Sequence, residues 1–118
     1  KQLLYPSGKL KKAIREHLDW NGIVYENPMR RKSLGRKSFD FFLPDYNLLI
    51  EYDGEQHFKP VQTYGGEEAL KKLLVRDEFK NRWAWENGYM LMRIPYWMKD
   101  RIPELLHRQL TLFTAEVA

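Results

Sequence analysis

Two apolar runs joined by a short turn constrain the fold of this chain more than any other feature. Residues 39–43 and 48–53 are rich in Phe, Leu and Ile, and residues 44–47 between them include Pro, Asp and Asn, which favour turns. Such a pattern predicts a β-hairpin. The second run becomes acidic where it ends, in the stretch IEYDGEQHF at residues 50–58. This change marks the end of the hairpin as a candidate site for chemistry.

Other segments predict the elements that would surround the hairpin. Apolar residues at helical spacing indicate helices, and Asn-Gly pairs after two of them are stop signals. We expect helices over residues 9–20, 67–86 and 102–113, and further strands over residues 23–26 and 89–94. The resulting order, α-β-β-β-α-β-α, predicts an α/β fold with a mixed central sheet, in which a meander of strands is flanked by helices.

Length and composition favour one folded domain. The chain has 118 residues, of which 43% are hydrophobic and 14% aromatic, and this is enough for a core. We treat residues 1–118 as a single domain, and the missing initiator Met suggests part of a longer chain. No apolar run approaches the roughly 20 residues of a membrane span, and the first residues do not resemble a signal peptide. We therefore expect no membrane association and a cytoplasmic location.

The charge distribution predicts a polyanionic partner. The formal charge is +4, and the first 37 residues hold ten basic residues but three acidic ones. A basic surface beside an acidic pocket suits a metal-dependent enzyme that acts on a nucleic acid. The candidate contacts to the DNA backbone are one lysine of the first helix and five residues of a basic loop: Lys12, Arg30, Arg31, Lys32, Arg36 and Lys37. The alternative is an ordinary solvated loop.

Three carboxylates are predicted to converge at the end of the hairpin. Successive strand residues alternate faces, so Glu51 and Asp53 share one face, and the hairpin brings Asp40 back beside them. Ionised carboxylates that lie close together are costly without compensation, which a divalent cation supplies. Because cysteine is absent, oxygen ligands would hold the ion, and these suit Mg²⁺, Mn²⁺ or Ca²⁺. The alternative is a set of acids that simply point into water.

Four more residues can complete a catalytic site. His57 follows a glycine that permits a bend, and its imidazole can take a proton from an attacking water; it can also be a metal ligand or pack against Phe58. Gln56 can orient a phosphate or a base. Asp77 and Lys80 lie on one stripe of the long helix. They either face a polar cavity, where Lys80 would hold the scissile phosphate, or form a surface ion pair.

The order and spacing of these residues resemble the PD-(D/E)XK nuclease superfamily, which has the restriction-endonuclease-like fold. The resemblance rests on Asp40, Glu51-Tyr52-Asp53 and Gln56-His57, within the run FDFFLPDYNLLIEYDGEQHF. It implies a core of helix, three-stranded meander, helix and strand, with Mg²⁺ bound at the positions of Asp40 and Glu51. The lysine of the family motif would fall at Asp53, which is a departure. Its role would then pass to Lys80 or His57.

A closer resemblance is to the very-short-patch-repair endonucleases and to the related phage homing endonucleases. It spans roughly residues 9–97 and includes the later stretches DEFKN and LMRIPY. The catalytic positions of that branch correspond here, in order, to Glu16, Asp40, Asp53 and His57. The resemblance implies that Glu16 orients His57 or a metal-bound water. The repair enzymes have a structural zinc site, which this chain cannot form with cysteines because it has none. If the chain is encoded by a phage, as the resemblance implies, it would act in the cytoplasm of a bacterial host.

Residues and resemblance together predict a site-specific homing endonuclease. It would hydrolyse phosphodiester bonds of double-stranded DNA with Mg²⁺, for which Mn²⁺ can substitute, and its products would carry 5′-phosphates. Asp40 and Asp53 are the expected metal ligands, with Asp53 favoured over Glu51 as the direct ligand. Cutting both strands needs two active sites, so we expect a homodimer or higher oligomer. The alternatives are a non-catalytic DNA-binding module on the same fold and a nuclease that acts on RNA or branched DNA.

Overall fold

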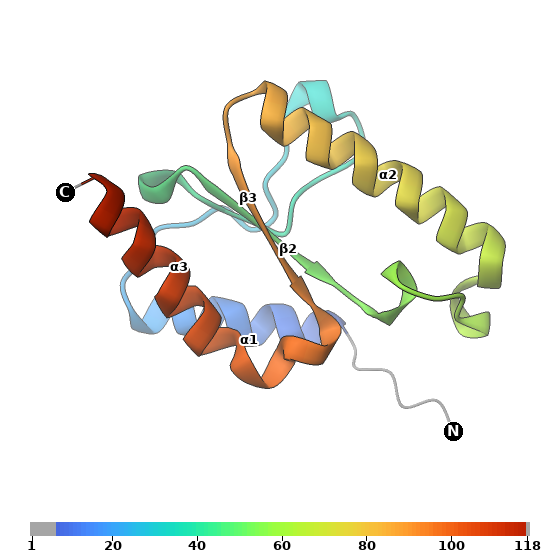
Figure 1. The fold of residues 1–118 in the computed structure, drawn as a ribbon, viewed down its shortest axis with the longest axis horizontal. Coiled ribbons are helices and arrows are strands. Elements are labelled where there is room, and N and C mark those ends of the chain that lie inside the picture. The colour runs from blue at the N-terminus through green and yellow to red at the C-terminus, as the bar shows by residue number, and fades with distance from the viewer. Residues whose placement is uncertain (1–6, 118) are drawn as a thin grey trace.

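A mixed three-stranded sheet lies between helices on its two faces. The computed structural model describes the backbone of residues 7–117 and the side chains of residues 10–112. Its helices and strands, in chain order, are α1 (Ser7–Trp20), β1 (Phe41–Leu43), β2 (Leu48–Asp53), α2 (Gly66–Glu86), β3 (Met90–Pro95) and α3 (Ile102–Val117). The sheet has the order β1-β2-β3, with β1 antiparallel and β3 parallel to β2. Helices α1 and α3 cover one face and α2 covers the other (Figure 1). The predicted α/β class is confirmed.

The hairpin predicted from the two apolar runs is confirmed. Strands β1 and β2 pair with Phe41 opposite Ile50. Residues 44–46 form a single 3₁₀ turn between the strands, and this turn keeps them adjacent. One step further along the same register, just before β1, Asp40 comes to lie beside Glu51. The local sequence thus creates the pairing of two acids.

The first strand of the predicted meander does not form. The backbone of residues 23–26 and of the segment after them pairs with the hairpin through two isolated bridges, at Glu26 and Met29, and forms no continuous strand. Pro28 lies between the two bridges and has no N–H to donate, so the ladder cannot continue there. The Asn27 side chain instead donates a hydrogen bond, at 2.6 Å, to the backbone carbonyl just before β1. The order of helices and strands is therefore α-β-β-α-β-α in the described part of the chain.

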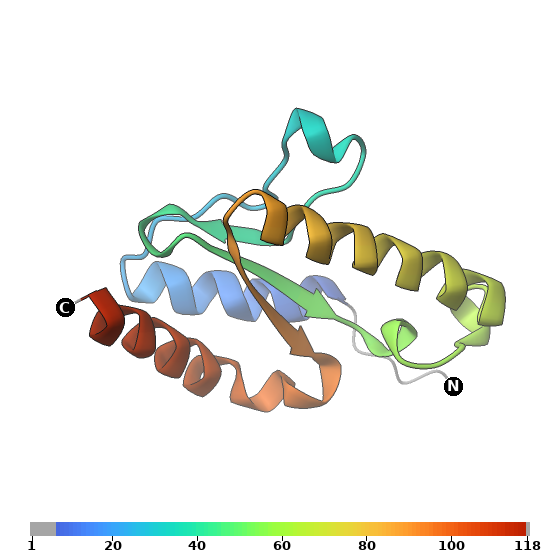
Figure 2. The same cartoon turned by 45° about the horizontal axis from the view of Figure 1, so that its top comes forward.

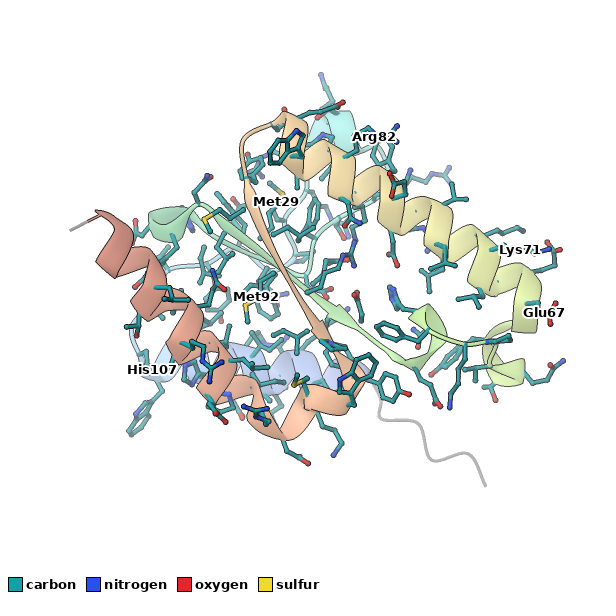
Figure 3. The ribbon with its side chains drawn as sticks, viewed as in Figure 1. Met29, Glu67, Lys71, Arg82, Met92 and His107 are labelled. Carbon is teal, nitrogen blue, oxygen red and sulfur yellow. The ribbon has the colours of Figure 1, made fainter. Side chains whose placement is uncertain are left out.

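Strand alternation divides the core into two clusters. Ile50 belongs to the cluster between the sheet and the α1–α3 layer, and Leu49 belongs to the cluster under α2. Both residues are fully buried, because β2 is the central strand and is covered on both faces. Figure 3 shows Met92 on the side of α3 and Met29 on the side of α2, in the same two clusters. Glu51 and Asp53, at alternate positions after Leu49 in β2, therefore face α2.

Helices α1 and α2 end as the sequence predicts, whereas α3 continues beyond the predicted residue 113 to Val117. Gly22 and Gly88 follow α1 and α2 and have left-handed backbones, with φ of 65° and 79°. At each end the N–H groups of the glycine and of the residue after it bond back to carbonyls of the last turn, which is a Schellman motif. No helix within residues 7–117 is long and apolar enough to cross a membrane.

Candidate functional site

Asp40 and Glu51 form a joined pair of carboxylates where the hairpin strands separate. The Asp40 backbone N–H donates to Glu51 Oε1 at 2.8 Å, and the Tyr52 N–H donates to Asp40 Oδ2 at 2.7 Å. Glu51 is almost fully buried, and the Asp40 side chain is 15% exposed. Backbone N–H groups therefore fix the positions of both carboxylates.

Each carboxylate of this pair has a lysine partner from a different helix. Lys80 of α2 is buried, donates to Glu51 Oε2, and lies 4.9 Å from the ring centroid of Phe39. Lys11 of α1 is more exposed, and its Nζ lies 2.9 Å from Asp40 Oδ1. The helices on the two faces of the sheet thus each supply one cation to the pair.

Burial dominates the electrostatics of Glu51. Loss of hydration raises the pKa of this carboxyl group, and the nearby charge of Asp40 raises it further. The Lys80 ammonium group and the Asp40 N–H oppose the increase but do not cancel it. The protein partners of Glu51 therefore offset only part of the cost of burying its charge beside Asp40. A divalent cation stabilises such an arrangement.

A second group of polar side chains lies at Asp53, where β2 ends. Asp53 Oδ1 accepts a hydrogen bond from Arg93 of β3 at 2.8 Å and lies 3.6 Å from His57 Nδ1. The same nitrogen of His57 lies 2.8 Å from Asp77 Oδ2 of α2. The side chains of Asp53, His57 and Asp77 are 7%, 11% and 16% exposed. Two strands, a turn and α2 thus contribute to one compact, mostly buried cluster.

A 3₁₀ turn over Glu55–His57 carries His57 back toward the sheet. The His57 N–H closes this turn on the Gly54 carbonyl at 3.0 Å. The expected bend forms, but it does not use the special freedom of a glycine backbone, because Gly54 has φ −71° and ψ 176°, which other residues adopt readily. A side chain at Gly54 would instead meet the Gln56 amide, which lies 2.6 Å from the position of an added Cβ.

Opposing effects set the charges of the second group. Burial raises the pKa of Asp53, although Arg93 and His57 oppose the rise. Burial also acts to raise the pKa of Asp77, but the hydrogen bond with His57 and the charges of His57 and Arg93 outweigh it, and this pKa is lowered. Lys80 contributes to the lowering as well, so the two groups of side chains are electrostatic neighbours. Asp77 therefore stays ionised beside the His57 ring.

The sequence-predicted residues of the helices divide between this site and the surface. Asp77 and Lys80 contact His57 and Glu51, so both turn toward the sheet and do not form a surface ion pair with each other. The Glu16 side chain, expected to orient His57, is 68% exposed and lies 3.9 Å from Lys12 on the outside of α1. The structure does not bring Glu16 to His57, because its position on α1 turns it into solvent.

Arg93 is a site residue that the sequence patterns did not single out. It lies opposite Glu51 in the parallel register of β2 and β3, and besides Asp53 it bonds the Asn81 side chain of α2 at 3.0 Å. A charged residue inside the apolar stretch LMRIP was the available signal, and it is the same kind of signal that marked Asp40. Its partners were not predictable, since they depend on which strand lies beside β3.

The basic loop is partly held against the body of the protein. Arg31 forms a two-pronged ion pair with Glu26, with N–O distances of 2.9 and 3.0 Å. Lys37 lies 4.5 Å from the ring centroid of Phe79 on α2. The other three candidate DNA contacts of this loop are exposed: Arg30, Lys32 and Arg36. Figure 2 shows the loop, coloured cyan, projecting from the body beside the C-terminal half of α2.

The predicted convergence of three carboxylates is reproduced only in part. Asp40 and Glu51 are joined, but Asp53 is held by Arg93 in the neighbouring group. Within the described part of the chain, no set of three or more Asp, Glu or His side chains is arranged to hold a metal ion. Mg²⁺ usually takes one or two carboxylates and completes its shell with water and substrate phosphates. The Asp40–Glu51 pair fits that mode, and this geometry favours Glu51 over Asp53 as the second carboxylate.

Comparisons with known proteins find uncharacterized viral proteins that are similar to part of this chain. The chain is 36% identical over 72 residues to the uncharacterized protein 307L of Invertebrate iridescent virus 6, a match that covers 60% of this chain and 36% of the relative. It is 35% identical over 74 residues to the uncharacterized protein 033L of Invertebrate iridescent virus 3, covering 62% of this chain and 37% of the relative.

A third viral relative matches a longer part of the chain. The uncharacterized protein 094L of Frog virus 3 is 32% identical over 87 residues, which are 72% of this chain and 53% of the relative. No family model matches the chain, and no solved structure does. The chain thus spans between about a third and about half of the length of the curated relatives it matches, and it is similar to a segment of these viral proteins.

Proposed function

We propose that this chain is the catalytic domain of a metal-dependent endonuclease that cuts double-stranded DNA, on a fold of the restriction-endonuclease type. The observation that carries the proposal is the buried Asp40–Glu51 pair with Lys80 in direct contact with Glu51. Two acids side by side on the hairpin and a lysine beside them are groups that phosphodiester hydrolysis uses. The lysine comes from α2, since Asp53 stands where the family motif has its lysine.

Asp40 and Glu51 would hold the Mg²⁺ ion, or Mn²⁺ in its place. Such an ion, when bound, polarises a phosphate oxygen and lowers the pKa of a coordinated water. Lys80 adds a buried positive charge beside Glu51, where it can stabilise charge that develops on a phosphate oxygen. Lys11 is one-third exposed at Asp40, so it can turn from the carboxylate to a phosphate group of the incoming strand.

His57 and Asp77 are the proposed general base and its orienting group. A proton on His57 Nδ1, which lies 2.8 Å from Asp77, leaves Nε2 free to accept the proton of an attacking water. Asp77 stays ionised because its pKa is lowered, and its charge stabilises the imidazolium that forms when His57 takes that proton. The exposed cations of the basic loop would contact the DNA backbone: Arg30, Lys32 and Arg36.

Cleavage of supercoiled plasmid tests this proposal. The protein is incubated with plasmid and Mg²⁺ or Mn²⁺, with EDTA in a parallel sample, and nicked and linear DNA are quantified on gels. We expect cleavage with either ion, none in EDTA, and none with the Asp40→Asn variant. Asp45→Asn is the matched control and should cut like the wild type, because Asp45 is an exposed acid at the other end of the hairpin. Metal-dependent cutting that persists at full rate in Asp40→Asn would refute the assignment.

A non-catalytic DNA-binding module on the same fold is the second candidate. It is favoured by the fact that each of the three carboxylates discussed above already has a protein cation as its partner. This candidate predicts that the protein retards DNA in a gel without metal-dependent cutting. A substrate panel of duplex DNA, RNA and branched DNA distinguishes both candidates from a nuclease with another substrate.

Self-association and target specificity are narrower parts of the same proposal. Two active sites are needed to cut both strands together, so we propose a homodimer or higher oligomer, which light scattering of the DNA-bound protein would detect. A site-specific homing activity would give a few discrete fragments from long DNA, whereas a random smear would contradict it.

A further inference from the structure

The structure contains a cavity of about 270 Å³ on the α2 side of the segment that follows β2. Its walls come from the segment after β2 and from the N-terminal half of α2. Gln56 and Arg76 line it, and these residues immediately precede His57 and Asp77 in the chain. The volume is just below the usual range for small-ligand sites, which begins at about 300 Å³. The cavity is therefore built from the same two segments as the candidate catalytic pair, although neither His57 nor Asp77 lines it.

The lining combines an apolar interior with cations. Leu70 and Leu73 of α2 contribute apolar surface, and Tyr64, which is 45% exposed, contributes an aromatic ring. Lys72 and Arg76, one helical turn apart on α2, are exposed cations. None of the described residues that line the cavity is acidic. The chemistry of the cavity therefore suits a ligand with a flat, weakly polar body and a negative charge.

We propose that this cavity binds one unstacked nucleotide of the DNA substrate, an inference that rests on the proposed function. The base would lie against Tyr64, since an aromatic ring binds any base by stacking. The Gln56 amide has both a donor and acceptor for the edge of the base. Arg76 and Lys72 would bind the phosphate, for which arginine offers a matching fork of donors. Binding here would hold the adjoining phosphodiester close to the turn that carries Gln56 and His57.

A nucleotide fits this cavity better than other classes of ligand, because it can use both the apolar half and the cationic half of the lining. A neutral apolar molecule would leave the two cations unused, and inorganic phosphate would leave the apolar interior unfilled. An unstacked nucleotide uses both halves, and enzymes that act on DNA are known to take a nucleotide out of the stack at a modest energetic cost. The substrate class is therefore DNA in which a nucleotide is unpaired or easily unpaired.

Calorimetric titration in EDTA tests the inference without any cleavage. The whole protein is titrated with each of the four deoxynucleoside 5′-monophosphates, and separately with thymidine, inorganic phosphate and decanoate. We expect at least one nucleotide to bind at least tenfold more tightly than thymidine or phosphate. Equal affinity for phosphate, tighter binding of decanoate, or no nucleotide binding at all would overturn the proposal.

Two pairs of variants locate the binding site. Arg76→Ala should weaken nucleotide binding by about tenfold, as expected for loss of a hydrogen bond to a charged group, whereas Arg82→Ala should not change it. Leu73→Trp, which fills the cavity without a change of charge, should abolish binding, whereas Leu74→Trp should not. Figure 3 shows Arg82 near the far end of α2, away from the cavity, and Leu74 is exposed and does not line the cavity. Equal effects within either pair would overturn the assignment to this cavity.

The two proposals can fail separately. Plasmid cleavage without nucleotide binding would remove the cavity from the mechanism and leave the endonuclease assignment standing. Nucleotide binding that obeys the variant pattern, in a protein that does not cut, would refute catalysis and retain the cavity as a nucleotide site.

Discussion

Removal of the Lys80 charge is the sharpest perturbation of the site. Lys80→Met keeps most of the volume of the side chain but removes the ammonium group that contacts Glu51. The side chains of both partners are less than a tenth exposed, at 8% and 6%. Loss of one partner from such a buried pair typically costs about 3–5 kcal/mol of stability, because the remaining charge has no compensation. We expect a loss near 3 kcal/mol at pH 7, since Glu51 can also escape the penalty by taking up a proton.

The loss of stability should depend on pH in a defined direction. Burial and Asp40 already raise the pKa of Glu51 above its ordinary value of 4.5, and removal of Lys80 raises it further. A raised carboxyl pKa favours the folded state at low pH, and that advantage disappears as pH rises through the folded-state pKa. As pH rises, the difference in free energy of unfolding between wild type and variant therefore starts to grow at the pH where Glu51 ionises in the wild-type fold. It grows by about 1.4 kcal/mol per pH unit until Glu51 also ionises in the variant.

Urea unfolding followed by tryptophan fluorescence measures this effect at pH 4.5, 6 and 7.5. The control is Lys71→Met, because Lys71 is an exposed lysine on the same helix (Figure 3) and should change stability by less than about 0.5 kcal/mol. The double variant Glu51→Gln/Lys80→Met should recover much of the loss at pH 7.5, since neither member of this pair then carries a charge. A loss that is the same at all three pH values, or no recovery in the double variant, would refute the electrostatic explanation.

Two other substitutions test the second group and the surface. Asp77→Asn should cost about 1–2 kcal/mol at pH 7 through its hydrogen bond to His57. Because the hydrogen bond with His57 and the charges of His57 and Arg93 lower the pKa of Asp77, its contribution is present above pH 3.8 and is lost as pH falls through the lowered value. The variant should therefore lose part of the acid dependence of stability below pH 3.8, which urea unfolding measures. Glu16→Ala should leave stability within about 0.5 kcal/mol and plasmid cleavage unchanged, because Glu16 is exposed on α1; a large loss of cleavage would restore the role that the resemblance implies.

Where local rules apply, the sequence anticipated the structure closely. The hairpin turn and the alternation of side chains along β2 were enough to place Asp40 beside Glu51 and to put Glu51 on the face of Leu49. The Asn-Gly stops ended α1 and α2 as expected. The strand expected at residues 23–26 failed for a local reason too, since the proline that follows it interrupts the ladder.

The charge partners were decided by tertiary packing. Glu51 and Lys80 are 29 positions apart, and Asp53 and Arg93 are 40 apart. The 3.6-residue period predicts which face of a helix is buried, but not how far the helix is shifted along the sheet, and that shift selects the lysine that reaches Glu51. The same packing gave Asp53 its own cation and left Glu16 in solvent. By itself, then, the sequence determined that acids gather at the end of the hairpin, because turns and alternation act over a few residues. Only the tertiary structure decided that Glu51, and not Asp53, is paired with Asp40. It also decided which cation each carboxylate contacts, because these contacts join segments that are far apart in the chain.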